Sequence, residues 1–316
     1  MTAEATPVER VKSRIAAVFG RWSRETTMAE MRADYEAMLA APAVEAGRPF
    51  AIGAMPAEWI IAEGADPGRA ILFLHGGGYQ IGSVRSHRDL MRRLSRAAGA
   101  AVLGIDYRLA PENRFPAAVD DGLAAYRWLL EQGFAPGSIA LAGDSAGGGL
   151  AVAVLLKARA EGLALPAAAA LFSPWTDMEA SGATYETRAA VDPLTQRDKI
   201  LLMARAYLGR GGDPRDPLAS PIHADLSDLP PMLIHVGDHE TILDDSRVFA
   251  DRAHAAGVAV ELTVWDRMIH QFQVFAGDIP EAQASIEAAG AFLHSRFAAP
   301  GQQPMPPETP SVSPVT

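Results

Sequence analysis

The chain has 316 residues, of which 49% are hydrophobic and 21% charged, and its formal net charge at pH 7 is −10. This length allows two ordinary domains or one large α/β domain. An acidic protein does not attract phosphate groups, so we expect it to bind neither nucleic acid nor anionic membranes. The absence of cysteine excludes disulfides and a thiol nucleophile. The first ten residues contain no apolar run, so we expect no secretory signal and a cytoplasmic protein.

Two amphipathic helices are predicted at the start of the chain. Apolar residues recur at helical spacing over residues 8–18 and again over 28–39, and Pro42 is expected to end the second helix. A short strand is predicted around residues 59–61, followed by a turn at Asp66-Pro67-Gly68.

From residue 69 onward, predicted strands and helices alternate. The strands are expected at 70–74, 101–105, 138–142, 167–172, 232–236 and 259–265, and the helices at 86–98, 117–130, 146–161, 243–256 and 280–297. Continuous apolar runs are typical of parallel strands that are buried on both faces. The alternation therefore predicts an α/β fold with a mostly parallel central sheet flanked by helices.

The alternation is interrupted between Trp175 and Pro230, where we expect an insertion on top of the sheet with one helix near residues 198–208. After Ala299 the chain is polar and proline-rich and has nothing to bury. The predicted organisation is an α/β domain at 46–177 and 221–299, an insertion at 178–220 and a disordered tail at 300–316.

Gly143-Asp144-Ser145-Ala146-Gly147 is a G-x-S-x-G element between a predicted strand and a predicted helix. In this context the motif forms a nucleophile elbow. The glycines leave room for a strained serine backbone. The serine hydroxyl then lies over a helix N-terminus, whose free N–H groups favour developing negative charge. Ser145 is therefore the candidate nucleophile.

His75-Gly76-Gly77-Gly78-Tyr79 follows the first long apolar strand. Successive glycines let backbone N–H groups face a substrate oxygen without obstruction by side chains. A phosphate-binding loop is the alternative, but no G-x-G-x-x-G fingerprint or Walker lysine accompanies the segment. We predict a contribution to an oxyanion hole, with His75 organising the loop.

A serine hydroxyl needs a base to accept its proton. Of eight histidines, His270 lies after the last predicted strand and before the final helix, where hydrolases of this topology present their base. His235 and His239 are four residues apart, but they do not share a helix face as a zinc pair requires. We therefore predict His270 as the base and no metal site.

The base needs a carboxylate that fixes its tautomer. Four candidates follow the strand at 232–236, namely Asp238, Glu240, Asp244 and Asp245. Asp244 and Asp245 open a helix, where carboxylates commonly serve the helix dipole and the cap, which leaves Asp238 and Glu240. Spacing along the chain does not separate them.

Taken together, five segments resemble the bacterial hormone-sensitive-lipase-like (family IV) carboxylesterases of the α/β-hydrolase superfamily. They are His75 to Gly78, Asp106 to Glu112, Phe115 to Ala118, Gly143 to Gly147 and the segment around His270. The resemblance runs from about residue 69 to 297.

The resemblance implies a serine esterase that hydrolyses short-chain esters of small molecules without a cofactor. It places the oxyanion-hole N–H groups on Gly77, Gly78 and Ala146, and it favours Glu240 over Asp238 as the acid, although the family more often has aspartate there. It also implies a helical cap built from residues 1–45 and the insertion at 178–220. Homodimers are common in the family, but the sequence itself identifies no interface.

Two alternatives remain at this point. The motifs do not encode the leaving group, so an amidase or carbamate hydrolase with the same triad is one rival. A non-catalytic receptor on this fold is the other, although the retained His270 argues against it. For the Arg108 to Glu112 segment we expect a structural role, with Arg108 and Glu112 paired and the loop supporting the glycine-rich turn.

Overall fold

The structure is a computed structural model that describes residues 5–40 and 47–298. Pro42 and the tail at 300–316, for which helix termination and disorder were predicted, lie outside these residues. Within them, an eight-stranded sheet has the order β1-β2-β4-β3-β5-β6-β7-β8. The strands are β1 (Arg48–Ile52), β2 (Met55–Ile60), β3 (Asp66–Leu74), β4 (Ala100–Ile105), β5 (Ile139–Asp144), β6 (Ala168–Phe172), β7 (Met232–Gly237) and β8 (Val260–Trp265).

The pairing from β4 through β8 is parallel, whereas β1 and β2 join the sheet antiparallel. This confirms the predicted α/β fold with a mostly parallel sheet. The helices are α1 (Pro7–Phe19), α2 (Met28–Leu39), α3 (Val84–Ala98), α4 (Ala117–Glu131), α5 (Ala146–Ala160), α6 (Thr184–Thr187), α7 (Arg197–Leu208), α8 (Leu243–Ala255) and α9 (Pro280–Arg296), with 3-10 turns η1 (Pro136–Ser138), η2 (Pro221–His223) and η3 (Phe272–Phe275).

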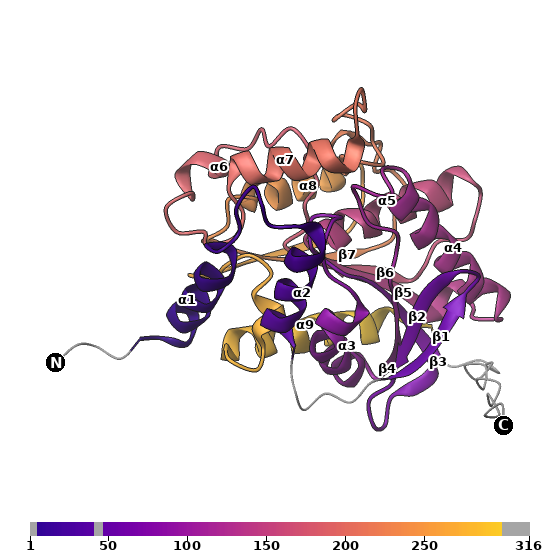
Figure 1. The fold of residues 1–316 in the computed structure, drawn as a ribbon. Helices are drawn as coiled ribbons and strands as arrows, with labels where there is room; N and C mark the ends of the chain where they lie inside the picture. The colour runs from indigo at the N-terminus through magenta and orange to yellow at the C-terminus, as the bar shows by residue number, and fades with distance from the viewer. Residues whose placement is uncertain (1–4, 41–46, 299–316) are drawn as a thin grey trace, which may run out of the picture.

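Successive side chains of a strand point to opposite faces of the sheet, and nearly all of those in the central strands β4, β3, β5, β6 and β7 are buried. In β3, Leu72 and Leu74 pack into one cluster with residues of α4, α5 and α8. Ile71 and Phe73 pack into a second cluster with residues of α3 and α9. The helices accordingly form two layers around the sheet (Figure 1). This three-layer arrangement brings the carboxyl ends of the parallel strands to one edge, where the loops carry the candidate site.

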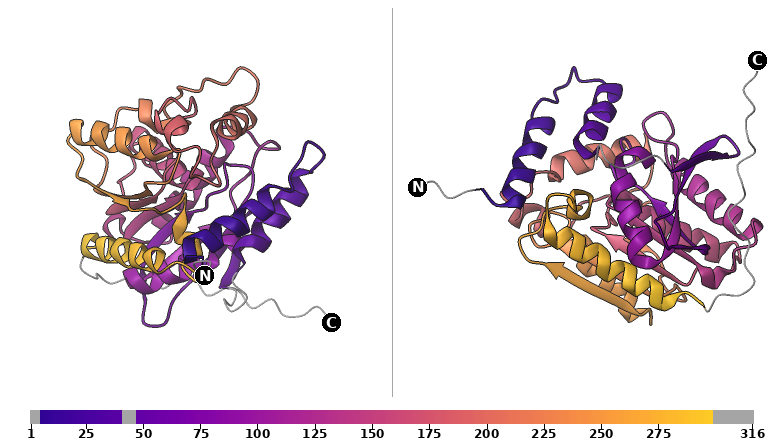
Figure 2. Two further views of the ribbon diagram at one scale, coloured as in Figure 1. Left: turned by 90° about the vertical axis from the view of Figure 1, so that its left-hand side faces the viewer. Right: turned by 90° about the horizontal axis from the view of Figure 1, so that it is seen from below.

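Two helical segments lie outside the alternating units. Helices α1 and α2 form a pair that projects beside the sheet (Figure 2), and each carries a capping box, formed by Thr6 with Glu9 and by Thr27 with Glu30. They pack into the same cluster as α3 and α9, whereas α7 packs into the other cluster through Ile200, Ala204 and Tyr207. No helix in the described part of the chain is both long and apolar enough to cross a bilayer.

The structure corrects three local predictions. Strand β1 was not predicted, because its exposed, weakly apolar residues give no clear pattern. The Asp66-Pro67-Gly68 segment, predicted as a turn, begins β3, since the Asp66 N–H donates to the Gly99 carbonyl. A tight local bond remains in this segment, because the Gly68 N–H donates to Asp66 Oδ1. The register of the β3–β4 pairing shifts between Asp66 and Ala70. The short helix α6 was predicted as loop.

Candidate active site

Ser145 stands at the sharp turn between β5 and α5. Its backbone has φ 53° and ψ −121°, a region that non-glycine residues rarely adopt. The turn is held because the Ser145 N–H donates to the Phe172 carbonyl of β6, while the Trp175 N–H donates to the Ser145 carbonyl. Strain of this kind costs about 1–3 kcal/mol and persists only where the surroundings fix it. The sequence-predicted elbow geometry is therefore present at Ser145.

Gly147 is required by the close approach of α5 to β3. A Cβ atom at this position would lie 1.9 Å from the Leu74 carbonyl oxygen, which belongs to the backbone of β3 and has little freedom to move. We expect Gly147→Ala to lower the free energy of unfolding by about 3 kcal/mol, measured by urea denaturation. Gly277→Ala is the control, because a Cβ there meets only an atom of Arg93 at 4.0 Å. Equal stability of the two variants would contradict this explanation.

His270 connects Ser145 to a carboxylate. Its Nε2 lies 2.8 Å from Ser145 Oγ, and its Nδ1 lies 2.8 Å from Glu240 Oε2. All three residues are buried, with exposed fractions of 8% for Ser145, 2% for His270 and 0% for Glu240. With Nδ1–H donating to Glu240, the Nε2 lone pair faces the serine hydroxyl, which is the tautomer that a general base needs.

Asp238 and Glu240, between which spacing along the chain did not decide, lie in different surroundings. Glu240 Oε1 accepts hydrogen bonds from the Ser173 hydroxyl at 2.7 Å and from the Gly237 N–H, so its second oxygen is held toward His270. The Asp238 side chain is 29% exposed and accepts a hydrogen bond from the Arg267 N–H. Among the described residues it has no contact with His270.

The electrostatic surroundings distinguish His270 from other buried histidines. Burial alone would lower the pKa of His270, but the hydrogen bond and charge of Glu240, with contributions from Asp192 and Asp144, raise it above the usual histidine value. Burial lowers the pKa of His75 to about 3 and that of His235 to about 4, so these rings are neutral at pH 7. Burial raises the pKa of the Glu240 carboxyl, and its hydrogen bond to His270 opposes that rise.

The glycine-rich turn lies beside Ser145. Gly77 and Gly78 line the same pocket as Ser145 and His270, and Ala146 begins α5 directly after the serine. Gly77 has φ 115°, and a Cβ on it would lie 2.2 Å from the Ile81 carbonyl oxygen, so glycine is needed there. Within the described residues, no group accepts a hydrogen bond from the N–H groups of Gly77, Gly78 or Ala146.

The Arg108 to Glu112 segment supports this turn, but not through the predicted ion pair. Arg108 instead binds Asp121 of α4, and Glu112 binds Arg32 of α2. The pairing was wrong because the two side chains reach in different directions from the loop. The support comes from the Ala110 N–H, which donates to the Tyr79 carbonyl at 2.8 Å. The preceding Tyr107 adds to it, because its hydroxyl donates to the His75 carbonyl and its ring stacks on the imidazole of His75.

Arg32 adds a contact between α2 and the turn. Its Nε donates to the Gln80 carbonyl at 2.8 Å and one terminal nitrogen donates to the Ala110 carbonyl at 3.1 Å. Asp144, which sequence reasoning also missed, accepts a hydrogen bond from the Gly76 N–H at 2.9 Å and lies 3.3 Å from His87 Nε2. These contacts join segments far apart in the chain, so no local signal identifies them.

A pocket leads to Ser145 from between the N-terminal helices α1 and α2 and the insertion at residues 178–220. Phe19 and Tyr35 come from the N-terminal helices, whereas Leu194, Ile200 and Met203 come from the insertion at residues 178–220. The cavity between these residues has a volume of about 40 Å³. The walls are largely apolar, as is usual for small-molecule sites.

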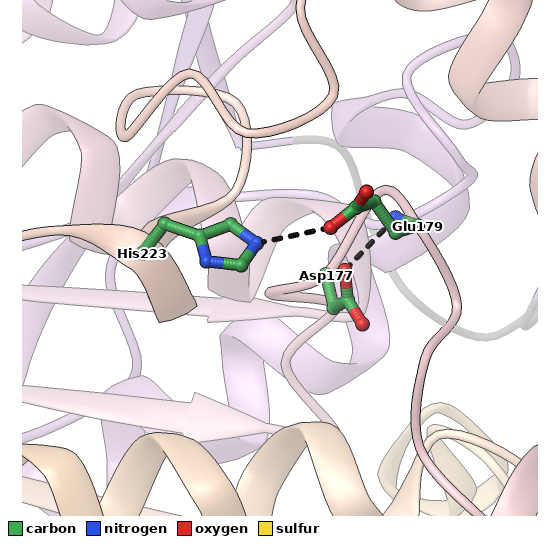
Figure 3. Close-up of side chains that lie close together, drawn as sticks. All are labelled: Asp177, Glu179 and His223. Atoms are coloured by element: carbon green, nitrogen blue, oxygen red, sulfur yellow. Dashed lines mark hydrogen bonds and ion pairs between the residues drawn. The ribbon is translucent and has the colours of Figure 1, made fainter.

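One group of side chains has the composition of a metal site. Asp177, Glu179 and His223 bring three ligand atoms within 4.8 Å of one another (Figure 3). Their hydrogen bonds explain the arrangement without an ion. Asp177 accepts from the Glu179 N–H and the Ser181 hydroxyl, and Glu179 binds the guanidinium of Arg215 at 2.8 Å. We assign no metal to this group.

Comparison with known proteins places the chain in a family. The profile of the α/β-hydrolase fold matches residues 71–274. An acetyl-hydrolase of Streptomyces hygroscopicus is 49% identical over 252 residues, which are 80% of this chain and 84% of the relative. The crystal structure of an esterase from the bacterial hormone-sensitive lipase family superposes with a TM-score of 0.89 at 46% identity and covers 94% of this chain and 100% of its own.

A second solved structure of an esterase is similar to this chain. The esterase EstE5, soaked with p-nitrophenyl butyrate, is 43% identical and superposes with a TM-score of 0.87, covering 94% of this chain and 100% of its own. This protein therefore belongs to the α/β-hydrolase fold family, within the bacterial hormone-sensitive-lipase group of carboxylic ester hydrolases.

Proposed function

We propose that the protein is a serine carboxylesterase that hydrolyses short-chain esters of small molecules through an acyl-enzyme on Ser145, with His270 as base and Glu240 as orienting acid. The observation that carries the proposal is the continuous set of contacts at 2.8 Å from Ser145 Oγ to His270 and from His270 to Glu240 Oε2. Ser145 and His270 line a pocket to which Gly77 and Gly78 also contribute.

In the first half-reaction, Ser145 Oγ attacks the ester carbonyl carbon while His270 Nε2 takes the hydroxyl proton. The oxyanion accepts hydrogen bonds from the N–H groups of Gly77, Gly78 and Ala146, and the role is supported because these groups have no other acceptor among the residues that the structure describes. The carbon–oxygen bond to the alcohol then breaks, and the imidazolium returns its proton to the leaving oxygen.

In the second half-reaction, a water molecule attacks the acyl carbon and gives its proton to His270. The bond to Ser145 Oγ breaks, Oγ regains the proton, and the carboxylic acid leaves. The ionised Glu240 stabilises the imidazolium in both halves without taking its proton.

We also propose that α1, α2 and the insertion form a cap that limits the acyl group. The apolar side chains that both segments contribute to the pocket support this assignment. A small, largely apolar pocket of this kind suits a short acyl chain better than a long fatty chain.

The test is hydrolysis of p-nitrophenyl acetate, butyrate, octanoate and palmitate by the wild-type protein, beside p-nitroacetanilide as the matched amide. We expect kcat/KM to be highest for the two- and four-carbon esters and at least about tenfold lower for palmitate, because each unaccommodated methylene requires the pocket to expand. Acid quenching followed by mass spectrometry should locate the acyl group on the peptide that contains Ser145. Faster hydrolysis of the anilide would favour an amidase, and no turnover of any substrate would favour a receptor.

A further inference from the structure

Asp192 lies in the insertion, and its carboxylate is bonded in two directions. Oδ1 accepts from the Leu194 and Thr195 N–H groups at 2.8 and 2.9 Å, which closes a local turn. Oδ2 accepts from the Thr241 N–H at 2.8 Å and from the Thr195 hydroxyl. Thr241 directly follows Glu240, so this second contact fixes the backbone of the loop at residues 238–242. Asp192 is 4% exposed, and solvent therefore does not compete for these bonds.

Other contacts join the same two segments. The Thr241 hydroxyl donates to the Thr195 carbonyl, and the Thr184 hydroxyl donates to the Thr241 carbonyl at 2.7 Å. From the N-terminal helices, Lys12 donates to the Val191 carbonyl at 2.9 Å. On the opposite side of this turn, Leu194 and Thr195 line the pocket that leads to Ser145. One short segment therefore contacts both the substrate space and the loop that carries Glu240.

From this arrangement we infer that Asp192 is a positioning residue for the proposed esterase reaction. Its carboxylate fixes the loop that carries Glu240 against the segment that lines the substrate pocket. The inference rests on the proposed function. Without the Asp192–Thr241 bond, the loop keeps its sequence and its carboxylate but loses one of the constraints that hold Glu240 Oε2 at 2.8 Å from His270. A displacement of about 1 Å at such a group is enough to cost roughly 100-fold in rate.

The negative charge of Asp192 gives a second, independent readout. The charged groups that face His270 are Glu240 from the β7–α8 loop, Asp144 from the end of β5 and Asp192 from the insertion, and all three favour the protonated imidazole. Lys12 of α1 faces Asp192 and partly offsets its charge. Removal of the Asp192 charge therefore lowers the pKa of His270, and a base with a lower pKa stays neutral at lower pH.

The chain contains a matched control for this test. Asp216-Pro217-Leu218 repeats the Asp192-Pro193-Leu194 tripeptide within the same insertion. The Asp216 carboxylate accepts from the Leu218 N–H at 2.9 Å, the same local bond that Asp192 makes to Leu194. In the described residues, Asp216 has no hydrogen bond to the loop at 238–242. The two aspartates thus share the bond to the residue two positions on, whereas Asp192 alone also binds Thr195 and Thr241.

The experiment compares Asp192→Asn and Asp216→Asn in the full chain with p-nitrophenyl butyrate, through kcat, KM, the pH profile of kcat/KM and Tm. An asparagine at 192 that keeps its oxygen on the turn presents an NH2 group to the Thr241 N–H, so the bond from residue 192 to Thr241 is lost while the local turn remains. We expect kcat to fall about 10- to 100-fold, KM to change less than about twofold, and the acid limb to move to lower pH. Asp216→Asn should leave all three unchanged.

Three outcomes would overturn the inference: an unchanged kcat and pH profile in Asp192→Asn, the same losses in Asp216→Asn, or a rise in KM alone. If the asparagine variant is unstable, Asp192→Ser is measured in its place. The serine hydroxyl can keep the local turn but does not reach Thr241. Failure of both variants to fold would assign Asp192 a purely structural role. Absence of ester turnover by the wild type would instead contradict the proposed function, so the two failures are distinguishable.

Discussion

The Ser145→Ala variant should hydrolyse p-nitrophenyl butyrate with a kcat about 10^5-fold below that of the wild type. The substitution removes the atom that forms the acyl-enzyme, and His270 then has no nucleophile within its 2.8 Å contact. Residual turnover would come from water activated in the pocket and from the oxyanion donors. KM should change little, because the pocket walls are unaltered. The measurement is initial-rate kinetics on protein purified apart from any wild-type enzyme.

Folding of this variant needs a separate check. Ser145 adopts φ 53°, where alanine is strained in the same way as serine, so Tm should stay close to that of the wild type. Ser13→Ala, at an exposed position of α1, is the matched control and should retain full activity. A Ser145→Ala protein with more than about 1% of wild-type kcat would contradict the proposed nucleophile, because such a rate is far above the residual expected without one.

The sequence predicted Ser145 and His270 as candidate residues because their signals are local. The G-x-S-x-G motif lies between an apolar strand and a helix, so the turn at Ser145 is predictable from neighbours in the chain. His270 is predictable from its place after the last strand, since the topology brings that loop to the same edge of the sheet. The parallel strands were predictable for a related reason: runs such as Ile71 to Leu74 are apolar at every position.

The remaining features depend on contacts between distant segments. The antiparallel strand β1 is exposed along much of its length and has little apolar pattern. Spacing did not separate Asp238 from Glu240, because the difference lies in where each side chain points and what holds it. The role inferred for Asp192 depends on a bond between residues 49 positions apart. The identical tripeptide at Asp216 shows that local sequence does not encode this contact.

Substitution of the two carboxylates separates their roles. We expect Glu240→Gln to lower kcat about 10^3- to 10^4-fold. The amide keeps the shape of the side chain but can donate its NH2 group to His270 Nδ1. This favours the tautomer that carries its proton on Nε2, so Nε2 then lacks the lone pair that must accept the Ser145 proton. The variant also loses the charge that stabilises the imidazolium. Initial rates with p-nitrophenyl butyrate across a range of pH provide the measurement.

Asp238→Asn is the natural comparison, since both residues lie in the same loop, two positions apart. The Asp238 carboxylate accepts from the Arg267 N–H on the exposed side of the loop, and an asparagine oxygen can accept that bond equally well. Its kcat should therefore stay within about twofold of the wild type, because an exposed charge without contact to the base is screened by solvent. The opposite result, a severe loss in Asp238→Asn with Glu240→Gln nearly unaffected, would assign the acid to Asp238. Similar severe losses in both variants would mean that the loop acts as one unit, and the pH profile would then identify which carboxylate sets the pKa of His270.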